Sequence, residues 1–318
     1  MIDNISKSKW IHFDEVQREQ LVSDIFNHYR NAGFPYFPTS NEYRINELAK
    51  IRSYDYTRVI DVSNKTITQS MHGLGLLWSY FPHSFGVKCN GKLTPIEIFN
   101  DDDLFKAVIR KRMKFGDNIS DNGIRKMIKV FTGAQAVSNF RPTAAAGIYH
   151  QFTSKGETVL DMSCGFGGRM LGAHLAGVNY IGTEPASLTY DGLMDFSKEL
   201  DIGSIIHKMG SETFVPDKDS IDFAFTSPPY FNVEKYSDEP TQSYMKYGTI
   251  DSWVNGFLAD TFSNVYHGLK DKKVMAINIA NSKNCPNVVE QTICVAKSVG
   301  FNHIDMWRYS LSKINSVG

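Results

Sequence analysis

Two adjacent prolines directly after an apolar run place a fixed corner in this chain. The run Ile221–Phe225 has the composition of a buried strand, and it leads into Thr226-Ser227-Pro228-Pro229-Tyr230. A proline has no backbone N–H for a sheet ladder, so the strand must end there. In open α/β sheets, ligands bind beyond the carboxyl ends of the strands. The corner therefore predicts a binding site that offers a hydroxyl, backbone carbonyls and an aromatic ring.

From about residue 140 onward, short apolar runs alternate with helix-like segments, which is typical of a parallel sheet covered by helices. We expect strands at Thr158–Met162, Tyr180–Glu184, Ile205–Met209, Ile221–Thr226, Lys273–Ile279 and His303–Tyr309. We expect helices between them at Gly168–Ala176, Leu188–Leu200, Ser252–Leu269 and Asn287–Val299. The earlier part is helical, aromatic and basic, with helices expected at Phe13–Ala32, Leu104–Phe115 and Asn122–Phe131. The expected organisation is a helical region at residues 1–138 and an α/β domain at residues 139–318.

A glycine turn follows the first of these strands and marks a candidate cofactor site. Gly165 and Gly167 allow the sharp bend, but the turn lacks the spacing of a dinucleotide or P-loop motif. Asp161 before it would repel a pyrophosphate and suits a positively charged amino-acid tail. Glu184 ends the next strand, where an acidic side chain can accept the hydroxyls of a ribose. Gly210-Ser211-Glu212 follows the third strand and is a plausible edge for an adenine ring.

Basic residues gather in the N-terminal region, although the whole chain has a formal net charge of zero. Between Lys106 and Arg141, nine Lys and Arg stand against two Asp. Two basic helices joined by residues 116–120 could form a helix-turn-helix surface for phosphates, or they could be two solvated amphipathic helices. The predicted contacts to nucleic acid are Arg110, Lys111, Arg112, Arg125, Lys126 and Lys129.

Composition narrows the class of protein further. The four cysteines form no C-x-x-C pair, and neither they nor the nine histidines have metal-ligand spacing, so we expect no metal. No secretory signal is visible, and no stretch approaches the ~20 apolar residues that span a bilayer. We expect a cytoplasmic protein with no membrane contact.

The corner and the glycine turn together resemble the S-adenosylmethionine-dependent DNA amino-methyltransferases. Thr226–Tyr230 is similar to their [S/N/D]-P-P-[Y/F/W] motif, and a serine preceded by threonine is most typical of the cytosine-N4 enzymes. Asp161–Gly167 resembles their cofactor motif, and Asn139–Thr143 the segment that closes over the methionine end of the cofactor. The N-terminal extension and Tyr236–Glu239 are similar to a branch associated with phages and mobile elements. The resemblance covers residues 139–318.

This resemblance implies a Rossmann-like methyltransferase fold, S-adenosylmethionine as cofactor, and methyl transfer to the exocyclic amino group of a flipped DNA base. Cytosine N4 is slightly preferred over adenine N6, and a restriction-modification role is implied. The implied catalytic residues are Ser227, Pro228, Pro229 and Tyr230. The implied cofactor-binding residues are Asp161, Ser163, Gly165, Gly167, Glu184, Ser211, Glu212, Thr226, Arg141, Pro142 and Thr143. The loop Phe231–Tyr247 should flank the substrate pocket.

Two departures from the family leave alternatives open. No room exists for a large target-recognition domain next to the motifs, so recognition would fall to the N-terminal region, a partner subunit or a homodimer. The usual final strand hairpin is also missing from the expected elements. An RNA amino-methyltransferase and a catalytically silent, nucleic-acid-binding subunit stay open as alternatives. Cytosine-C5 chemistry needs a Pro-Cys nucleophile, and the sequence has only the reverse order at Cys285-Pro286.

Overall fold

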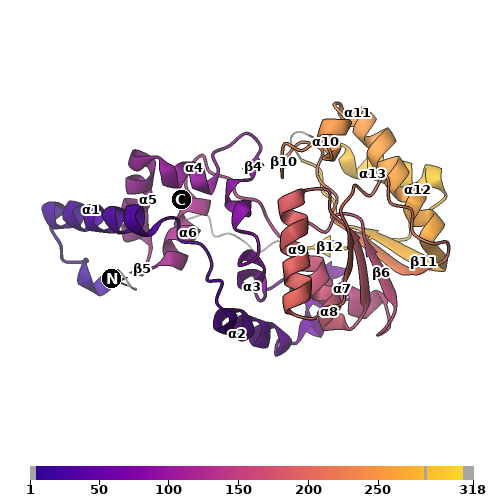
Figure 1. Ribbon diagram of the computed structural model, residues 1–318, viewed down its shortest axis with the longest axis horizontal. Helices are drawn as coiled ribbons and strands as arrows, with labels where there is room; N and C mark the ends of the chain where they lie inside the picture. The colour runs from indigo at the N-terminus through magenta and orange to yellow at the C-terminus, as the bar shows by residue number, and fades with distance from the viewer. Residues whose placement is uncertain (1–4, 283–284, 311–318) are drawn as a thin grey trace. The chain divides into compact units, whose positions relative to one another are not determined.

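A computed structural model describes residues 5–282 and 285–310 (Figure 1). The chain forms two compact units. Unit 1 comprises residues 1–38 and 82–137, and unit 2 comprises residues 39–81 and 138–318. The sequence-based division after residue 138 lies at the last junction between the units. Residues 39–81, which that division assigns to the N-terminal region, instead pack with the α/β unit.

Unit 1 is mainly helical and has its own apolar core. Its elements are β1 (Ile5–Ser6), η1 (Lys7–Lys9), α1 (Glu15–Ala32), η3 (Pro82–Gly86), β4 (Lys88–Cys89), α4 (Pro95–Asn100), α5 (Asp102–Phe115), β5 (Asn118–Ile119) and α6 (Asp121–Lys129). A capping box between Asp14 and Gln17 starts α1, and the Ser120 side chain caps α6. The core includes Phe105 and Ile109 of α5 with Ile124 of α6.

Unit 2 is built on a five-stranded parallel sheet with the strand order β11-β9-β6-β7-β8. The strands are β6 (Thr158–Asp161), β7 (Asn179–Thr183), β8 (Ile205–His207), β9 (Ile221–Thr226) and β11 (Leu269–Ile277). The first three strands run outward in sequence from the centre, and β9 and β11 extend the other side. This order is that of a doubly wound, Rossmann-like sheet, with β6 and β9 flanking the switch point. The expected α/β fold class is confirmed.

Helices cover both faces of this sheet, as buried parallel strands require. They are α7 (Pro142–Phe152), α8 (Gly168–Ala176), α9 (Ser187–Glu199), α12 (Ala259–Gly268) and α13 (Val288–Val299). On one face, Phe152 of α7 stacks on Phe223 of β9 with ring centroids 5.5 Å apart. On the other, Leu160 and Ala224 belong to a cluster with Val265 of α12. Because successive side chains on a strand alternate, β9 contributes to both layers and is buried throughout.

Residues 39–81 support the α/β unit from outside the predicted domain. They form α2 (Asn41–Arg52), η2 (Tyr56–Val59), β2 (Ile60–Asp61), β3 (Thr66–Ile67) and α3 (Leu74–Trp78). The rings of Trp78 and Phe81 lie 5.3 and 5.4 Å from the ring of Phe166, in the turn after β6. Burial of these aromatic rings explains why the segment joins unit 2, because side chains of this size contribute strongly to a core.

Two expected elements differ from the structure in more than small shifts of their bounds. The strand expected at His303–Tyr309 is wrong in extent and in partner, since only β12 (Arg308–Tyr309) forms and it pairs with β3 in a separate three-stranded sheet. The helix expected at Ser252–Leu269 is interrupted, because η4 (Trp253–Leu258) is a π-helix between α11 (Ile250–Ser252) and α12. The remaining short elements are β10 (Glu234–Lys235) and α10 (Ser243–Lys246). The final segment, from Leu311, lies outside the described residues.

Within the described residues, no helix is long and apolar enough to cross a membrane.

Candidate active site

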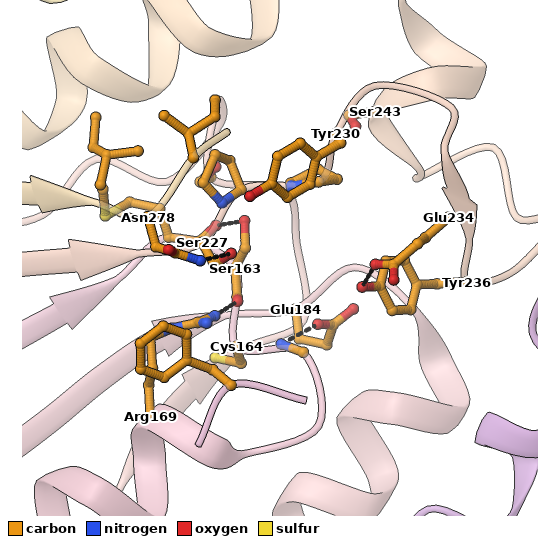
Figure 2. Close-up of a pocket in the computed structure, with 18 of the residues that line it drawn as sticks. Ser163, Cys164, Arg169, Glu184, Ser227, Tyr230, Glu234, Tyr236, Ser243 and Asn278 are labelled. Carbon is orange, nitrogen blue, oxygen red and sulfur yellow. Dashed lines mark hydrogen bonds between the residues drawn. The ribbon is translucent and has the colours of Figure 1, made fainter. Parts of the chain in front are cut away.

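A cavity of about 480 Å³ lies in unit 2 at the carboxyl ends of the parallel strands. It is lined by the turn after β6 and by the residues that follow β7, β8, β9 and β11. The Pro-Pro corner predicted a binding site at this edge, and the cavity occurs there. Figure 2 shows side chains from these separate strand ends pointing toward one space.

The cavity brings together most of the predicted site residues. The predicted residues that line it are Arg141, Ser163, Gly165, Glu184, Ser211, Glu212, Ser227, Pro228, Pro229 and Tyr230. Five other predicted residues are not part of this lining: Asp161, Gly167, Thr226, Pro142 and Thr143. Gly167 instead caps α8 with φ +74°, and Pro142 begins α7, where a missing N–H costs nothing. Gly167 and Pro142 thus set the backbone at the starts of two helices without lining the cavity.

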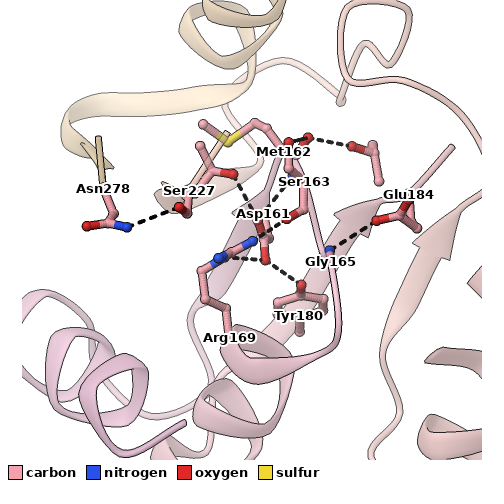
Figure 3. Close-up of polar contacts among 11 residues, drawn as sticks. Asp161, Met162, Ser163, Gly165, Arg169, Tyr180, Glu184, Ser227 and Asn278 are labelled. Atoms are coloured by element: carbon pink, nitrogen blue, oxygen red, sulfur yellow. Dashed lines mark hydrogen bonds and ion pairs between the residues drawn. The ribbon is translucent and has the colours of Figure 1, made fainter. Parts of the chain in front are cut away.

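Asp161 is completely buried and hydrogen-bonds inside the protein. Its carboxylate pairs with the Arg169 guanidinium at 2.8 Å and accepts hydrogen bonds from Tyr180 Oη at 2.6 Å and Thr226 Oγ1 at 3.1 Å (Figure 3). The backbone N–H of Ser163 adds a fourth bond. The positive charge that the sequence reasoning assigned to a cofactor tail is supplied here by Arg169 of the same chain.

Arg169 is the main charged residue that the sequence reasoning missed. It lies in the first turn of α8, lines the cavity, and donates to the Ser163 carbonyl as well as to Asp161 (Figure 3). Burial alone would lower the pKa of this guanidinium, but the Asp161 carboxylate raises it, so Arg169 stays charged. Its position immediately after the glycine turn, eight residues beyond an acidic strand end, was the available signal.

Glu184 turns its carboxylate toward the glycine turn. Its two oxygens accept from the backbone N–H groups of Gly165 at 3.0 Å and Ala186 at 2.9 Å. Burial raises the pKa of Glu184 to about 7, against the lowering effect of these two hydrogen bonds. The side chain lines the cavity, so the carboxylate can accept further hydrogen bonds from a bound molecule.

Glu212 lines the cavity, and only one of its two carboxylate oxygens has a hydrogen-bond partner among the described residues. Its Oε1 pairs with Lys246 Nζ at 2.6 Å, while Oε2 is buried without a hydrogen-bond partner among the described residues. A buried acceptor without a hydrogen-bond partner is costly. Arg141 Nε is a buried donor in the same condition, and burial lowers the pKa of Arg141.

The Pro-Pro corner presents Ser227 and Tyr230 to the cavity. Asn278, the residue after β11, donates from Nδ2 to Ser227 Oγ at 3.0 Å (Figure 2). Burial raises the pKa of Tyr230, so its hydroxyl stays neutral at physiological pH. The next residue, Phe231, has φ +51°, a left-handed conformation that is unfavourable for a bulky side chain. Such strain is found where a structure holds functional groups in place.

The loop Phe231–Tyr247 runs along the cavity, as its predicted flanking position implies. Glu234, Tyr236, Thr241, Gln242, Ser243 and Tyr244 are among the lining residues. Glu239 anchors the loop by accepting from the Ser187 backbone N–H at 3.0 Å, at the start of α9. The Trp253 indole of the π-helix donates to Ser243 Oγ at 3.1 Å. The π-helix thus supports the same wall of the site.

Cys164 lies in the glycine turn and lines the cavity, but it is not an activated nucleophile. Burial raises the pKa of its thiol well above the ordinary value, so the sulfur stays protonated. Its sulfur lies against Gly182, where an added Cβ would approach it to 2.3 Å. In the part of the chain that the structure describes, no group of His, Cys, Asp and Glu could hold a metal ion.

The predicted basic side chains of unit 1 differ in their availability. Arg125 is buried and donates to the carbonyls of Pro35 and Tyr36, and Arg112 donates to Asn118 at two positions. Arg110 pairs with Glu19 at 2.6 Å. The others are less engaged: Lys126 is exposed, while Lys111 and Lys129 are partly buried and lie over aromatic rings. Arg112 and Arg125 thus make internal contacts in unit 1, whereas Arg110 and Lys126 are exposed.

No protein-family model and no curated protein matches this chain. Similar solved structures include the Haemonchus contortus phosphoethanolamine N-methyltransferase 2 bound to S-adenosyl-L-methionine, 18% identical with a TM-score of 0.35, over 49% of this chain and 36% of that one. A cyclopropane synthase from Mycobacterium tuberculosis is 15% identical with a TM-score of 0.36, over 50% of this chain and 60% of that one. The geranyl diphosphate C-methyltransferase of Streptomyces coelicolor is 18% identical with a TM-score of 0.35, over 49% of this chain and 58% of that one. The aligned part spans less than two thirds of each of these three structures.

Proposed function

We propose that this chain is an S-adenosylmethionine-dependent methyltransferase that acts on the exocyclic amino group of a DNA base, with cytosine N4 slightly preferred over adenine N6. One observation carries the proposal. Glycine-turn, acidic and Ser-Pro-Pro-Tyr residues at the ends of successive parallel strands line a single cavity. A cofactor with a ribose and an adenine, and a flat amino-bearing substrate, need this combination of groups side by side.

The residues of the cavity suit this cofactor. Glu184 would accept the ribose hydroxyls, since both of its oxygens retain acceptor capacity beyond the backbone N–H groups that they bind. Glu212 and Arg141 also line the cavity, and their side chains would face the adenine amino group and the methionine carboxylate, respectively. When bound, the cofactor supplies an electrophilic methyl group on a sulfonium sulfur.

The Pro-Pro corner supplies what the other substrate needs. An exocyclic amino nitrogen is a poor nucleophile because its lone pair is delocalised into the ring. Ser227 Oγ and the Pro228 carbonyl would accept its two N–H bonds and draw the nitrogen toward tetrahedral geometry. Tyr230 lines the same wall, and its ring would stack on the base. Orientation and electrostatic positioning account for most of the acceleration in such a mechanism.

Recognition of DNA falls to unit 1 in this proposal. Lys111 and Lys126 on α5 and α6 would contact phosphates, and the target base would be flipped out of the duplex because its amino group is otherwise paired. A partner subunit or a second copy of the chain could add contacts for a specific sequence, as a restriction-modification role would need. DNA as substrate rests on the Ser-Pro-Pro-Tyr motif together with these helices.

A methylation assay tests the proposal directly. The purified chain is incubated with methyl-labelled S-adenosylmethionine and unmodified mixed-sequence DNA, and the digested nucleosides are identified by mass spectrometry. We expect N4-methylcytosine or N6-methyladenine from the wild type and a loss of at least about 100-fold in Ser227→Ala. The same assay with RNA is the comparison. Product in RNA alone would exclude DNA as substrate, and no product with either would exclude this activity for the isolated chain.

Calorimetry separates catalysis from cofactor binding. We expect S-adenosylhomocysteine to bind the wild type and Ser227→Ala equally, since Ser227 belongs to the substrate side of the cavity. Absence of binding to the wild type would contradict the cofactor assignment and favour a catalytically silent subunit.

A further inference from the structure

Asn278 lies beside Ser227, the proposed binding group for the target amino nitrogen. The amino-acid sequence alone does not reveal this position. Asn278 follows β11, which pairs in parallel with β9, and the register sets Ile277 opposite Thr226. The Asn278 backbone N–H donates to the Thr226 carbonyl at 2.8 Å. The two strands therefore end side by side, and Asn278 lies next to Ser227. Both residues line the cavity.

The hydrogen bonds around Ser227 determine what its hydroxyl offers to the cavity. A serine hydroxyl has one proton and two acceptor lone pairs. The Asn278 amide donates to Ser227 Oγ and so occupies one lone pair (Figures 2 and 3). Tyr230 lies close to the Ser227 side chain and the Ala280 backbone, and both neighbours partly offset the rise that burial causes in the pKa of Tyr230.

The Asn278 contact occupies one acceptor position of Ser227 and leaves it a second lone pair. An amino substrate needs that lone pair, because its N–H groups are donors. A hydroxyl proton aimed at the attacking nitrogen would instead hydrogen-bond the nitrogen's own lone pair and reduce its nucleophilicity. The amide of Asn278 opposes this, because a donor bound at one lone pair limits the directions that the hydroxyl proton can take.

We propose that Asn278 is a positioning residue that makes Ser227 a hydrogen-bond acceptor for the target amino group. The inference rests on the proposed function and extends it to a second strand end. Asn278 acts through Ser227 and touches no reacting atom itself. Its role is therefore to raise the rate of methyl transfer while leaving cofactor affinity unchanged.

The test compares single-turnover methylation rates in a double-mutant cycle. We expect Asn278→Ala and the volume-matched Asn278→Leu to slow methyl transfer about tenfold or more, as misplacement of a reacting group does. We expect Ser227→Ala combined with Asn278→Ala to be no slower than Ser227→Ala alone, because the amide then has no hydroxyl to orient. Binding of S-adenosylhomocysteine should stay within about twofold of wild type in all variants, which also establishes that they fold.

A matched control is Asn179→Ala, which removes an amide hydrogen bond of 2.8 Å to the Gly156 carbonyl. Asn179 is the first residue of β7, so this bond lies at the amino ends of the strands, away from the cavity. The methylation rate of this variant should equal that of the wild type. Two outcomes would overturn the positioning role while leaving the proposed function intact. One is a wild-type rate in Asn278→Ala. The other is that Asn278→Ala slows Ser227→Ala by the same factor as it slows the wild type. An inactive wild type on both DNA and RNA would overturn the proposed function, and the inference with it.

Discussion

The substitution Asp161→Asn should destabilise unit 2 strongly, although aspartate and asparagine have nearly the same size and shape. In Asp161→Asn, the Arg169 guanidinium keeps its charge but loses its counter-ion, and the two side chains are only 0% and 5% exposed in the native structure. Removal of one partner from a buried ion pair costs about 3–5 kcal/mol in free energy of unfolding, because an uncompensated charge stays buried. We expect a loss in this range in the protein without ligand.

The assay is urea unfolding followed by circular dichroism, together with hydrogen exchange at β6, which reports on the unit that contains the pair. Asp305→Asn is the matched control, since its partner Lys65 is 52% exposed and such surface pairs contribute about 0–1 kcal/mol. We expect Arg169→Met, added to Asp161→Asn, to restore most of the lost stability by removing the unpaired charge.

Equal stability losses in Asp161→Asn and Asp305→Asn would refute this reasoning. Asp161 would then be free in the protein without ligand and available to contact a cofactor directly, as the sequence alone suggested. A double variant less stable than Asp161→Asn would refute the ion-pair account as well.

Other consequences can be measured independently. Glu184 has a folded pKa of about 7 against a usual value of 4.5, so the folded state binds more protons than the unfolded state between those pH values. Stability from this group should therefore be full below about pH 4.5 and decline as pH rises to about 7, and Glu184→Gln should flatten the curve of urea midpoint against pH. Glu212→Ala should weaken S-adenosylhomocysteine about tenfold or more in calorimetry, and unchanged affinity would contradict an adenine contact at Glu212. The double variant Lys111→Ala with Lys126→Ala should weaken DNA binding and reduce the slope of log affinity against log salt by up to about 0.9 per lost phosphate contact. The control Arg112→Ala should mainly lower the stability of unit 1, because Arg112 hydrogen-bonds Asn118. An unchanged salt slope in the lysine variant would contradict a phosphate-binding surface.

The regular parts of the fold could be predicted because they follow local rules. Ile221–Thr226 is the expected strand without a change of bounds, since an apolar run that ends in two prolines has few alternatives. The glycine turn likewise fixed the start of α8 at Gly168. By contrast, His303–Tyr309 has a strand-like pattern, but its partner β3 lies far away in sequence, and no local signal indicates that pairing.

The site was harder to predict than the strands that carry it. Each strand end could be located, so Glu184, Glu212 and Ser227 were identified as residues at one edge. Which of them face the cavity depends on side-chain partners that the sequence does not specify. Asp161 illustrates this, because its position is that of a cofactor ligand while its carboxylate is taken up by Arg169. Asn278 was missed because it belongs to no motif and matters only through the parallel pairing of β11 with β9.

The discontinuous course of unit 2 decides how this protein can be dissected. A fragment that begins at residue 139 would lose Trp78 and Phe81, whose rings pack against Phe166 in the glycine turn. Such a fragment would retain every recognised motif and still lack part of the wall behind the turn. A fragment that starts at residue 39 and replaces residues 82–137 with a short linker would keep the unit whole. The same cut would delete both basic helices, α5 and α6, so it would test whether the proposed methyl-donor binding survives without the proposed DNA contacts.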